Sequence, residues 1–539
     1  MALALAAGLA ATRDGIGISR DSAVYLGSAE RLAEGDGLRV PFRPYPLSPT
    51  PDPLATSERL ENFPPLYPAT LAALSRITGI EARPVARALN AVLLAALVLL
   101  VAAIVYVASG RRLALSLLIA LLTLLSIDVL ITASMLWTEL LFTLLSVVAL
   151  VLVAMHVERP RWATLVVCAA VVALAFLTRL AGAALVLGVA SSLLLLSRRP
   201  WTARLRDAAV VVAAAGLPVV AWMAVTSAGA DRVANRELAL HPPGAAALGG
   251  ATETVVSWVL PSRVAGRDGQ GPAGQVIATV AKLPALLRGF IVVAALTALV
   301  ILARRRRGPD VSASPPLNLL PPVLLLFLGS YALFLLVSSA LFDAALARFD
   351  HRILMPAHVV ALVAAGVLVA QRVDVNRFWR PASVVVAPLV LLLAVDAVVA
   401  LVDGRQFGGV FASPRWRTSP IMAAVRDLPS DRIVVTNEPG AVWAITGRPA
   451  AAVPEQKSVV TLKANSHLHA DLVALGRAMH RRGAALVYVD GAGESSFAAD
   501  EATLTASLPL KLVRHAADGR IYEITCPAEA TSSPERDVC

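Results

Sequence analysis

The chain has 539 residues, of which 57% are hydrophobic and only 16% are charged. Soluble domains carry about 25% charged residues, so this composition excludes an ordinary soluble protein and indicates a membrane protein. The formal net charge of +11 does not indicate nucleic-acid binding, because the arginines lie in short clusters between apolar runs and no basic patch alternates with aromatic residues.

The long apolar runs predict transmembrane helices. Residues 1–12 are apolar but shorter than the roughly 20 residues that cross a bilayer, so we expect a first span truncated at its start. A signal peptide is the alternative, although a charged start and a cleavage context are missing. Since lipid forces backbone groups to pair within helices, we expect a polytopic α-helical membrane protein with about eleven spans. The other runs are 85–109, 113–133, 139–157, 163–177, 180–197, 208–227, 281–303, 318–341, 353–371 and 382–402.

Arginine clusters at every second connection predict the topology. By the positive-inside rule they all face the cytoplasm if the N-terminus is cytoplasmic. The first loop 13–68, the junctions near Glu139 and Arg179, and everything after about residue 403 then lie outside the plasma (inner) membrane. The clusters are 111–112, 159–161, 198–206, 304–307 and 372–380.

The end of the chain loses the membrane character and alternates strand-like and helix-like patterns. We therefore expect a transmembrane domain over 1–402, a small extracytoplasmic α/β domain over 403–526 and a disordered tail over 527–539. No Walker-type or dinucleotide glycine motif occurs in the α/β segment. The expected strands are 432–436 and 485–489, the expected helices 439–445 and 470–481, and the expected closing hairpin joins 511–514 to 520–524.

The three cysteines do not form a metal-type cluster with histidines. Cys168 lies in an apolar run and is expected to be a packing residue. Cys526 and Cys539 would pair if the terminal domain faces an oxidising compartment, but their spacing alone does not decide this.

Two acids flank the first loop, and each has two interpretations. Asp21 follows Ser19 and starts a helical pattern with Tyr25 on the same face. It is either a helix-start acid or a general base whose basicity is raised by partial desolvation. Glu61 precedes Phe63-Pro64-Pro65-Leu66-Tyr67-Pro68, a rigid turn that forbids a helix before about residue 66. It is either a solvated acid or one held at a fixed depth.

Further charges lie at the ends of apolar runs. Glu139 starts the predicted fourth span, where an acid is a functional hypothesis, or a helix-start acid beside the interfacial Trp137. Asp128 is of the same kind. Arginines at the outer ends of later spans would grip a phosphate bidentately. Their alternatives are contacts with lipid headgroups and ion pairs with Asp343 or Asp350. These arginines are Arg179, Arg348 and Arg352.

The order of these motifs resembles the C-type membrane glycosyltransferases, in particular the bacterial relatives of protein O-mannosyltransferases and of the lipid A aminoarabinose transferase. The resemblance covers about residues 1–400. It is carried by Asp21-Ser22-Ala23-Val24-Tyr25, Phe63-Pro64-Pro65-Leu66-Tyr67-Pro68, Thr138-Glu139-Leu140, Leu177-Thr178-Arg179-Leu180-Ala181-Gly182 and Arg352-Ile353-Leu354-Met355-Pro356.

The resemblance implies an inverting transfer of a hexosyl or pentosyl group from a polyprenyl-phosphate donor to a glycan, lipid or protein acceptor of the cell envelope. It implies that Asp21 is the base that deprotonates the acceptor hydroxyl. Two departures matter: the mannosyltransferases have an Asp-Glu pair where this chain has Asp21-Ser22, and the first span is short. We expect donor or acceptor positioning by Tyr25, Glu61 and Glu139, and lipid-phosphate binding by Arg179, Arg348 and Arg352.

Some members of the family bind a divalent metal near these acids, which makes Glu61 and Glu139 candidate ligands, but nothing in the sequence demands a metal or another cofactor. The alternative function is a transporter or flippase of a lipid-linked sugar. Transporters commonly show internal repeats and sites near the midplane, whereas this chain shows no repeat and gathers its polar residues at one boundary. A non-catalytic envelope assembly protein is a third interpretation.

Overall fold

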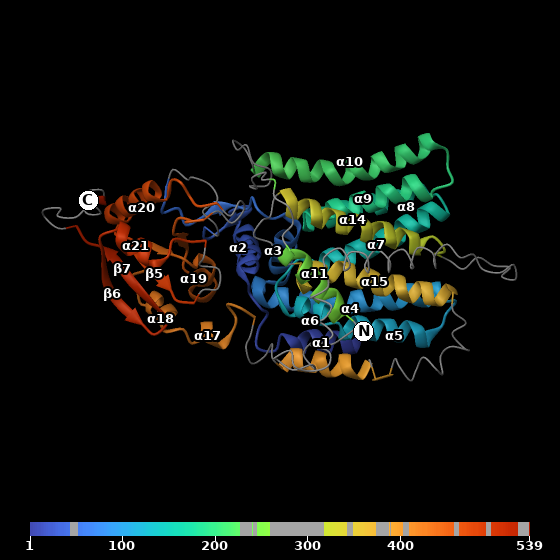
Figure 1. The fold of residues 1–539 in the computed structure, drawn as a ribbon, viewed down its shortest axis with the longest axis horizontal. Helices are drawn as coiled ribbons and strands as arrows, with labels where there is room; N and C mark the ends of the chain where they lie inside the picture. The colour runs from blue at the N-terminus through green and yellow to red at the C-terminus, as the bar shows by residue number, and fades with distance from the viewer. Residues whose placement is uncertain are drawn as a thin grey trace.

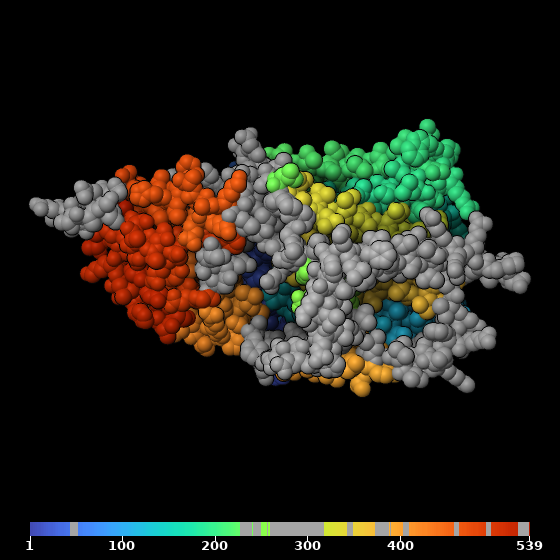
Figure 2. Space-filling view, in the orientation of Figure 1, coloured from blue at the N-terminus to red at the C-terminus, as the bar shows by residue number. Residues whose placement is uncertain are grey.

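The computed structural model describes residues 1–43, 52–226, 240, 245–258, 317–341, 349–372, 387–388, 390–402, 409–457, 463–491, 497–526 and 538–539. Long helices run side by side in one part of the molecule, an α/β domain forms the opposite end, and α2 and α3 lie between them (Figure 1). The space-filling view shows the red and orange domain and the green helices at opposite ends (Figure 2).

The described residues contain five helices that are long and apolar enough to cross a membrane, so the expected multi-pass character is confirmed. Predicted span 281–303 lies outside the described residues, and the total of about eleven stays a prediction. The five are α4 (Ala82–Ala108), α7 (Glu139–Glu158), α10 (Trp201–Thr226), α14 (Leu320–Leu341) and α15 (His351–Arg372); shorter apolar helices are α1 (Ala2–Ala11), α8 (Trp162–Thr178), α9 (Gly182–Leu196) and the helix Val390–Val402.

The predicted span 113–133 is bent, because the chain breaks within it. Helices α5 (Leu113–Leu125) and α6 (Ile127–Ser134) meet at an angle of 55°. Ser126 between them is extended, and its hydroxyl accepts a hydrogen bond from the Val129 N–H, which caps α6. Hydrophobicity alone therefore gave the extent of the segment but missed its capping serine.

The first loop forms helices where its start signals predict them. Helix α2 (Arg20–Glu34) is capped by Ser19, whose hydroxyl accepts from the Ser22 N–H, and it ends at the left-handed Gly35. Helix α3 (Leu66–Thr78) begins directly after the double proline, as expected. Between them β1 (Arg39–Val40) pairs antiparallel with β2 (Glu58–Arg59).

The segment before α2 joins three distant parts of the chain. The Gly17 N–H donates to Ser134 O at 2.8 Å, and Gly17 O accepts from the Leu136 N–H at 2.9 Å. On the other side, Ile18 O accepts from the Phe411 N–H at 2.9 Å. A Cβ on Gly17 would lie 2.2 Å from Met135 Sδ, so this close approach requires glycine. The loop thus contacts both the α6–α7 junction and the entry to the terminal domain.

The terminal domain is a five-stranded mixed sheet with helices, and the predicted strands, helices and hairpin are confirmed. Strand β3 pairs parallel with β4 and β5, while β7 pairs antiparallel with β5 and β6. Strand β4 was missed because its three alanines have low strand propensity. The sheet order is β4 (Ala450–Ala452), β3 (Val434–Thr436), β5 (Ala485–Val489), β7 (Gly519–Ile524), β6 (Leu510–Ala516); the helices are α17 (Pro414–Arg417), α18 (Pro420–Arg426), α19 (Pro439–Thr446), α20 (Leu468–Arg482) and α21 (Glu501–Ser507).

One hydrophobic core continues from the first loop into the terminal domain. It contains buried residues of α2 and α3 together with residues of α18, α19, β3 and β5. The Trp443 ring of α19 lies 5.4 Å from the Phe42 ring of the first loop, and the Arg83 guanidinium donates to Ala444 O at 2.8 Å. The domain and the loop therefore pack as one unit.

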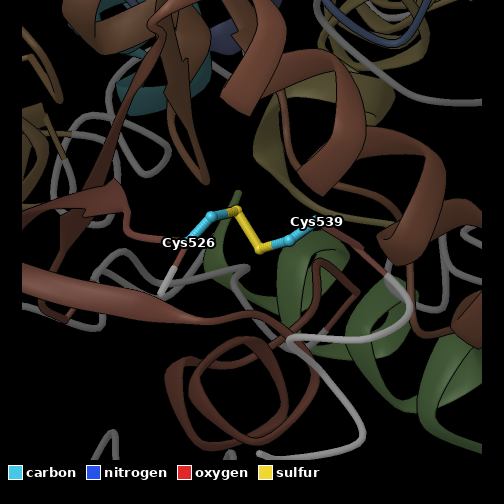
Figure 3. The surroundings of a disulfide bond; sticks show 2 residues. All are labelled: Cys526 and Cys539. Carbon is cyan, nitrogen blue, oxygen red and sulfur yellow. A yellow bond between two sulfur atoms is a disulfide. The ribbon is translucent and has the colours of Figure 1, made fainter. Parts of the chain in front are cut away.

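A disulfide closes the end of the chain. Cys526 and Cys539 form a disulfide bond (Figure 3). Their spacing in the sequence had left this pairing open. Val538 is buried against Gly476 of α20, so the last two residues are ordered and the expected tail disorder is wrong for them; residues 527–537 lie outside the described residues. Cys168 is buried with a free thiol, as a packing residue should be.

Glu58 on β2 gives the first loop a pH dependence. The carboxyl is half-buried, and burial raises its pKa from 4.5 to about 8, with Arg43 opposing the shift. A raised carboxyl pKa contributes stability that is full below pH 4.5 and is lost as the pH rises through about 8.

We therefore expect that the stability of the wild type falls across this interval and that Glu58→Gln flattens the fall, since glutamine stays neutral. Thermal unfolding of the detergent-solubilised protein from pH 4 to 9 would measure it. The matched variant Glu34→Gln, on the exposed end of α2, should leave the slope unchanged, and equal slopes in wild type and Glu58→Gln would contradict the expectation.

Candidate functional site

Four charged side chains from distant parts of the chain meet at the end of the helix bundle that faces the first loop. Asp21 lies in the first turn of α2, and Glu139 is the first residue of α7. Arg179 follows α8, and Arg352 is the second residue of α15. The sequence predicted all four separately, and the structure brings them together.

Arg352 bridges the two acids. Its Nη1 donates to Asp21 Oδ2 at 2.7 Å, and its Nε donates to Glu139 Oε1 at 2.5 Å. Arg179 forms a second ion pair with Glu139 and donates to Thr138 Oγ1 at 2.9 Å. Arg352 therefore pairs with Asp21 and Glu139 and not with the expected alternative Asp350, while Asp343 lies outside the described residues.

The four side chains differ in how far they are buried. The Glu139 side chain is fully buried, whereas those of Asp21, Arg179 and Arg352 are 20–23% exposed. A buried carboxylate is costly unless it is paired, so the two guanidiniums stabilise its charge. The two acids and two arginines sum to zero charge. The exposed parts of Asp21 and the arginines can therefore meet a ligand while Glu139 holds them.

An aromatic residue that the sequence analysis treated only as an interfacial anchor supports this arrangement. The Arg352 guanidinium lies over the Trp137 ring, 4.5 Å from its centroid, and the Trp137 Nε1–H donates to Ser19 Oγ at 2.9 Å. The indole thus links the arginine to the residue that caps the helix bearing Asp21. Its position two residues before Glu139 was the only signal in the sequence.

Two aromatic residues of the Phe63–Pro68 motif pack against the ring of Tyr25. The Tyr25 ring packs edge-on against Phe63 and Tyr67, with centroids 5.0 and 5.8 Å away, and the Tyr67 hydroxyl donates to Asn90 Oδ1 at 3.2 Å. Burial and the neighbouring Asp21 charge raise the pKa of the Tyr25 hydroxyl, so it stays protonated near neutral pH. Tyr25 lies one turn after Asp21, and its protonated hydroxyl can donate a hydrogen bond.

One predicted residue, Glu61, has no described contact with this group, and another, Arg348, cannot be placed. No described hydrogen bond or ion pair joins Glu61 to it, although burial raises the pKa of the Glu61 carboxyl. Arg348 lies outside the described residues.

Asp128 forms a second polar cluster at the start of α6. Its carboxylate is 2% exposed and interacts with His351 Nδ1 at 2.5 Å and His358 Nδ1 at 3.0 Å. The Trp258 Nε1–H donates to the same carboxylate at 2.7 Å, and the Trp258 ring stacks on His358. These partners fix the start of α15, which carries Arg352. Sequence reasoning singled out Asp128 but not its partners, which lie far away along the chain.

The donor set does not suit a divalent cation. Arginine bonds occupy both carboxylates of the Asp21–Glu139 group, and a cation there would meet two guanidiniums. Across the described ranges no three His, Cys, Asp or Glu side chains gather as metal ligands. We derive no step through a metal.

Comparison with solved structures shows that the chain has the fold of the C-type membrane glycosyltransferases, as the motifs predicted. The arabinofuranosyltransferase AftD from mycobacteria aligns with a TM-score of 0.53 at 16% identity, covering 98% of this chain and 40% of AftD. This chain thus spans less than half of AftD. ArnT from Cupriavidus metallidurans, solved bound to undecaprenyl phosphate, aligns with a TM-score of 0.46 at 14% identity, covering 97% of this chain and 96% of ArnT.

No protein-family model matches the chain, and no curated protein matches it in sequence. The expected relation to protein O-mannosyltransferases stays a prediction.

The buried position of Glu139 has a measurable consequence. Glu139→Gln leaves Arg179 and Arg352 as neighbouring like charges, and breaking a buried ion pair in this way costs about 3–5 kcal/mol. We expect a clearly lower thermal unfolding temperature in detergent. The matched variant Glu34→Gln removes an exposed acid that pairs with Arg31, which should cost less than about 1 kcal/mol. Similar losses in the two variants would show that the Glu139 pairs are not what stabilises this end.

Proposed function

We propose that this protein is an inverting glycosyltransferase that moves a sugar from a polyprenyl-phosphate donor to a hydroxyl of a cell-envelope acceptor on the outer face of the membrane. The observation that carries the proposal is the group formed by Asp21, Arg352, Glu139 and Arg179 at one end of the bundle. It supplies a carboxylate base and two guanidiniums within one site, on a fold used by sugar transferases.

The chemistry needs one base and a stabilised leaving group. Asp21 accepts the proton of the acceptor hydroxyl while that oxygen attacks the anomeric carbon from the face opposite the phosphate. The bond between the anomeric carbon and the phosphate oxygen breaks, and the polyprenyl phosphate leaves with the electron pair. Because a phosphate is a good leaving group, no general acid is required, and Arg352 and Arg179 offset its developing charge.

The ion pair between Asp21 and Arg352 fits this scheme. Arg352 donates to Asp21 Oδ2 and so holds this carboxylate beside the guanidinium that would bind the phosphate. The donor phosphate then competes for Arg352 and releases Asp21 to the acceptor. In this proposal Glu139 holds both arginines, and Tyr25 and Glu61 position the reacting groups. We also propose that Arg348 binds the lipid phosphate, as expected from the sequence. Arg348 itself lies outside the described residues.

The charge distribution supports an extracytoplasmic site. Helices α7 and α15 begin at the site and end near Arg159 and Arg372, and α8 runs back from Arg161 to Arg179. Arg159, Arg161 and Arg372 thus lie at the opposite end from the site, which by the positive-inside rule is the cytoplasmic end. We propose a plasma-membrane location, with residues 1–402 as the transmembrane part, 403–526 as an outer domain and 527–539 as a tail. The Cys526–Cys539 disulfide agrees with an oxidising compartment.

No structural observation favours the flippase alternative. The two acids of the site, Asp21 and Glu139, lie at helix starts on one side of the bundle, whereas transporter sites lie near the midplane.

The first test is sugar transfer in membranes from a panel of radiolabelled polyprenyl-phosphate sugars. We expect Asp21→Asn to lower transfer by a factor of about 100 or more at equal membrane abundance, because the amide cannot act as a base. The matched variant Asp36→Asn makes the same change at an exposed residue just beyond the far end of α2 and should transfer at the wild-type rate. Equal transfer by Asp21→Asn would remove Asp21 as the base.

The proposed topology predicts which cysteines react from outside. In Cys539→Ser the freed Cys526 thiol should react with a membrane-impermeant maleimide in intact spheroplasts, whereas the wild type should not react. Arg161→Cys, made with the disulfide intact, should react only after permeabilisation, because Arg161 lies at the other end of α8. The reverse pattern would place the terminal domain in the cytoplasm.

A further inference from the structure

The residue before Asp21 connects the site to the terminal domain. Arg20 forms an ion pair with Glu438, with both guanidinium branches in contact: Nε donates to Glu438 Oε2 at 3.1 Å, and Nη2 pairs with Oε1. The Glu438 side chain is only 2% exposed and that of Arg20 is 25% exposed. Such a bidentate, largely buried contact fixes orientation as well as distance.

Adjacent residues on a helix point about 100° apart, so Arg20 and Asp21 reach different sides of α2. Arg20 reaches the terminal domain, and Asp21 reaches Arg352 of the bundle. Figure 1 shows α2 between α19 and the long helices. The first turn of α2 is therefore held by two ion pairs from two directions.

The domain presents Glu438 on a rigid support. Glu438 follows β3, the strand at which the sheet order reverses, since β4 and β5 pair with its two sides. In open α/β sheets this carboxyl edge is where ligands bind. The Asn437 side chain exchanges hydrogen bonds with Val489 of β5 at 2.9 and 3.0 Å, and the Glu438 N–H donates to Thr436 Oγ1. In this protein Glu438 at that edge forms an ion pair with Arg20 of α2.

Close packing around the ion pair leaves α2 little room to move. A Cβ on Gly440, at the start of α19, would lie 3.6 Å from Ala23 Cβ of α2. One turn further, a Cβ on Gly27 would lie 2.5 Å from Pro41 and 3.4 Å from the Trp443 ring. Helix α2 therefore packs against the terminal domain along two helical turns.

We infer that Glu438 is a positioning residue for Asp21: through Arg20 it holds the first turn of α2, so that the carboxylate faces the reacting groups. This inference rests on the proposed glycosyltransferase function. It makes the terminal domain a part of the site. Without the ion pair, the first turn would lose one of the two ion pairs that hold it, and Asp21 would sample other positions.

The test compares Glu438→Gln with Asp52→Asn. Asp52 also joins the first loop to the domain, through Arg482 at 2.7 Å, but its ion pair is exposed and far along the chain from α2. In Glu438→Gln we expect faster amide hydrogen exchange in the first turn of α2 and a kcat lowered about ten- to a hundredfold, with the donor KM within about twofold of wild type. Asp52→Asn should change neither. Arg20→Lys keeps the charge but loses the fork, so it should give an intermediate loss and serves if Glu438→Gln does not accumulate.

The outcomes separate the two proposals. Unchanged exchange in the first turn of α2, or unchanged kcat despite faster exchange, would overturn the positioning role and leave the glycosyltransferase proposal intact. Equal losses in Glu438→Gln and Asp52→Asn would show a general loosening of the domain and would also overturn it. Absence of transfer by the wild type with every donor would refute the glycosyltransferase proposal, and the exchange comparison alone would then decide whether Glu438 holds α2.

Discussion

The fully buried carboxylate of Glu139 is the constraint on which the rest of the site depends. A charge at that depth is stable only with partners of opposite sign, and the chain supplies Arg179 from the end of α8 and Arg352 from the start of α15. Three helix ends are thereby held at one point. Because Arg352 also reaches Asp21, the same interaction fixes the distance between the bundle and the first loop.

The first loop is the connection between the two halves of the molecule. Its apolar side continues into the core of the terminal domain, and its Gly17–Ile18 segment forms backbone hydrogen bonds with both the α6–α7 junction and residues 409–411. Helix α2 therefore has a fixed place relative to both halves. In the proposed reaction, a base on such a helix would stay aligned between a donor held by the bundle and an acceptor from outside, which is the preorganisation that this chemistry requires.

The charged residues of the site differ in charge and in burial, and these differences suit them to different roles in the proposed reaction. The four groups at the site are neutral as a set, so an arriving phosphate adds the unbalanced charge and can draw a guanidinium toward itself. Glu139 cannot follow, because it is buried at a helix start, whereas Asp21 is partly exposed and can turn to a hydroxyl. One acid thus acts as an anchor and the other is available for chemistry, although they share an arginine.

The sequence by itself determined the features that local patterns encode. Apolar runs marked the described spans, Ser19 and the double proline set the starts of α2 and α3, and Glu139 was correctly placed at the first position of α7. Only the tertiary structure decided that Arg352 pairs with Asp21, 331 residues away, that Ser126 bends a span and that Glu438 meets Arg20. Periodicity and capping act within a few residues and can be read from the sequence. The partner in an ion pair depends on how the helices pack and on the cost of leaving a buried charge unpaired. These two factors join residues far apart in the chain, so the sequence does not show them.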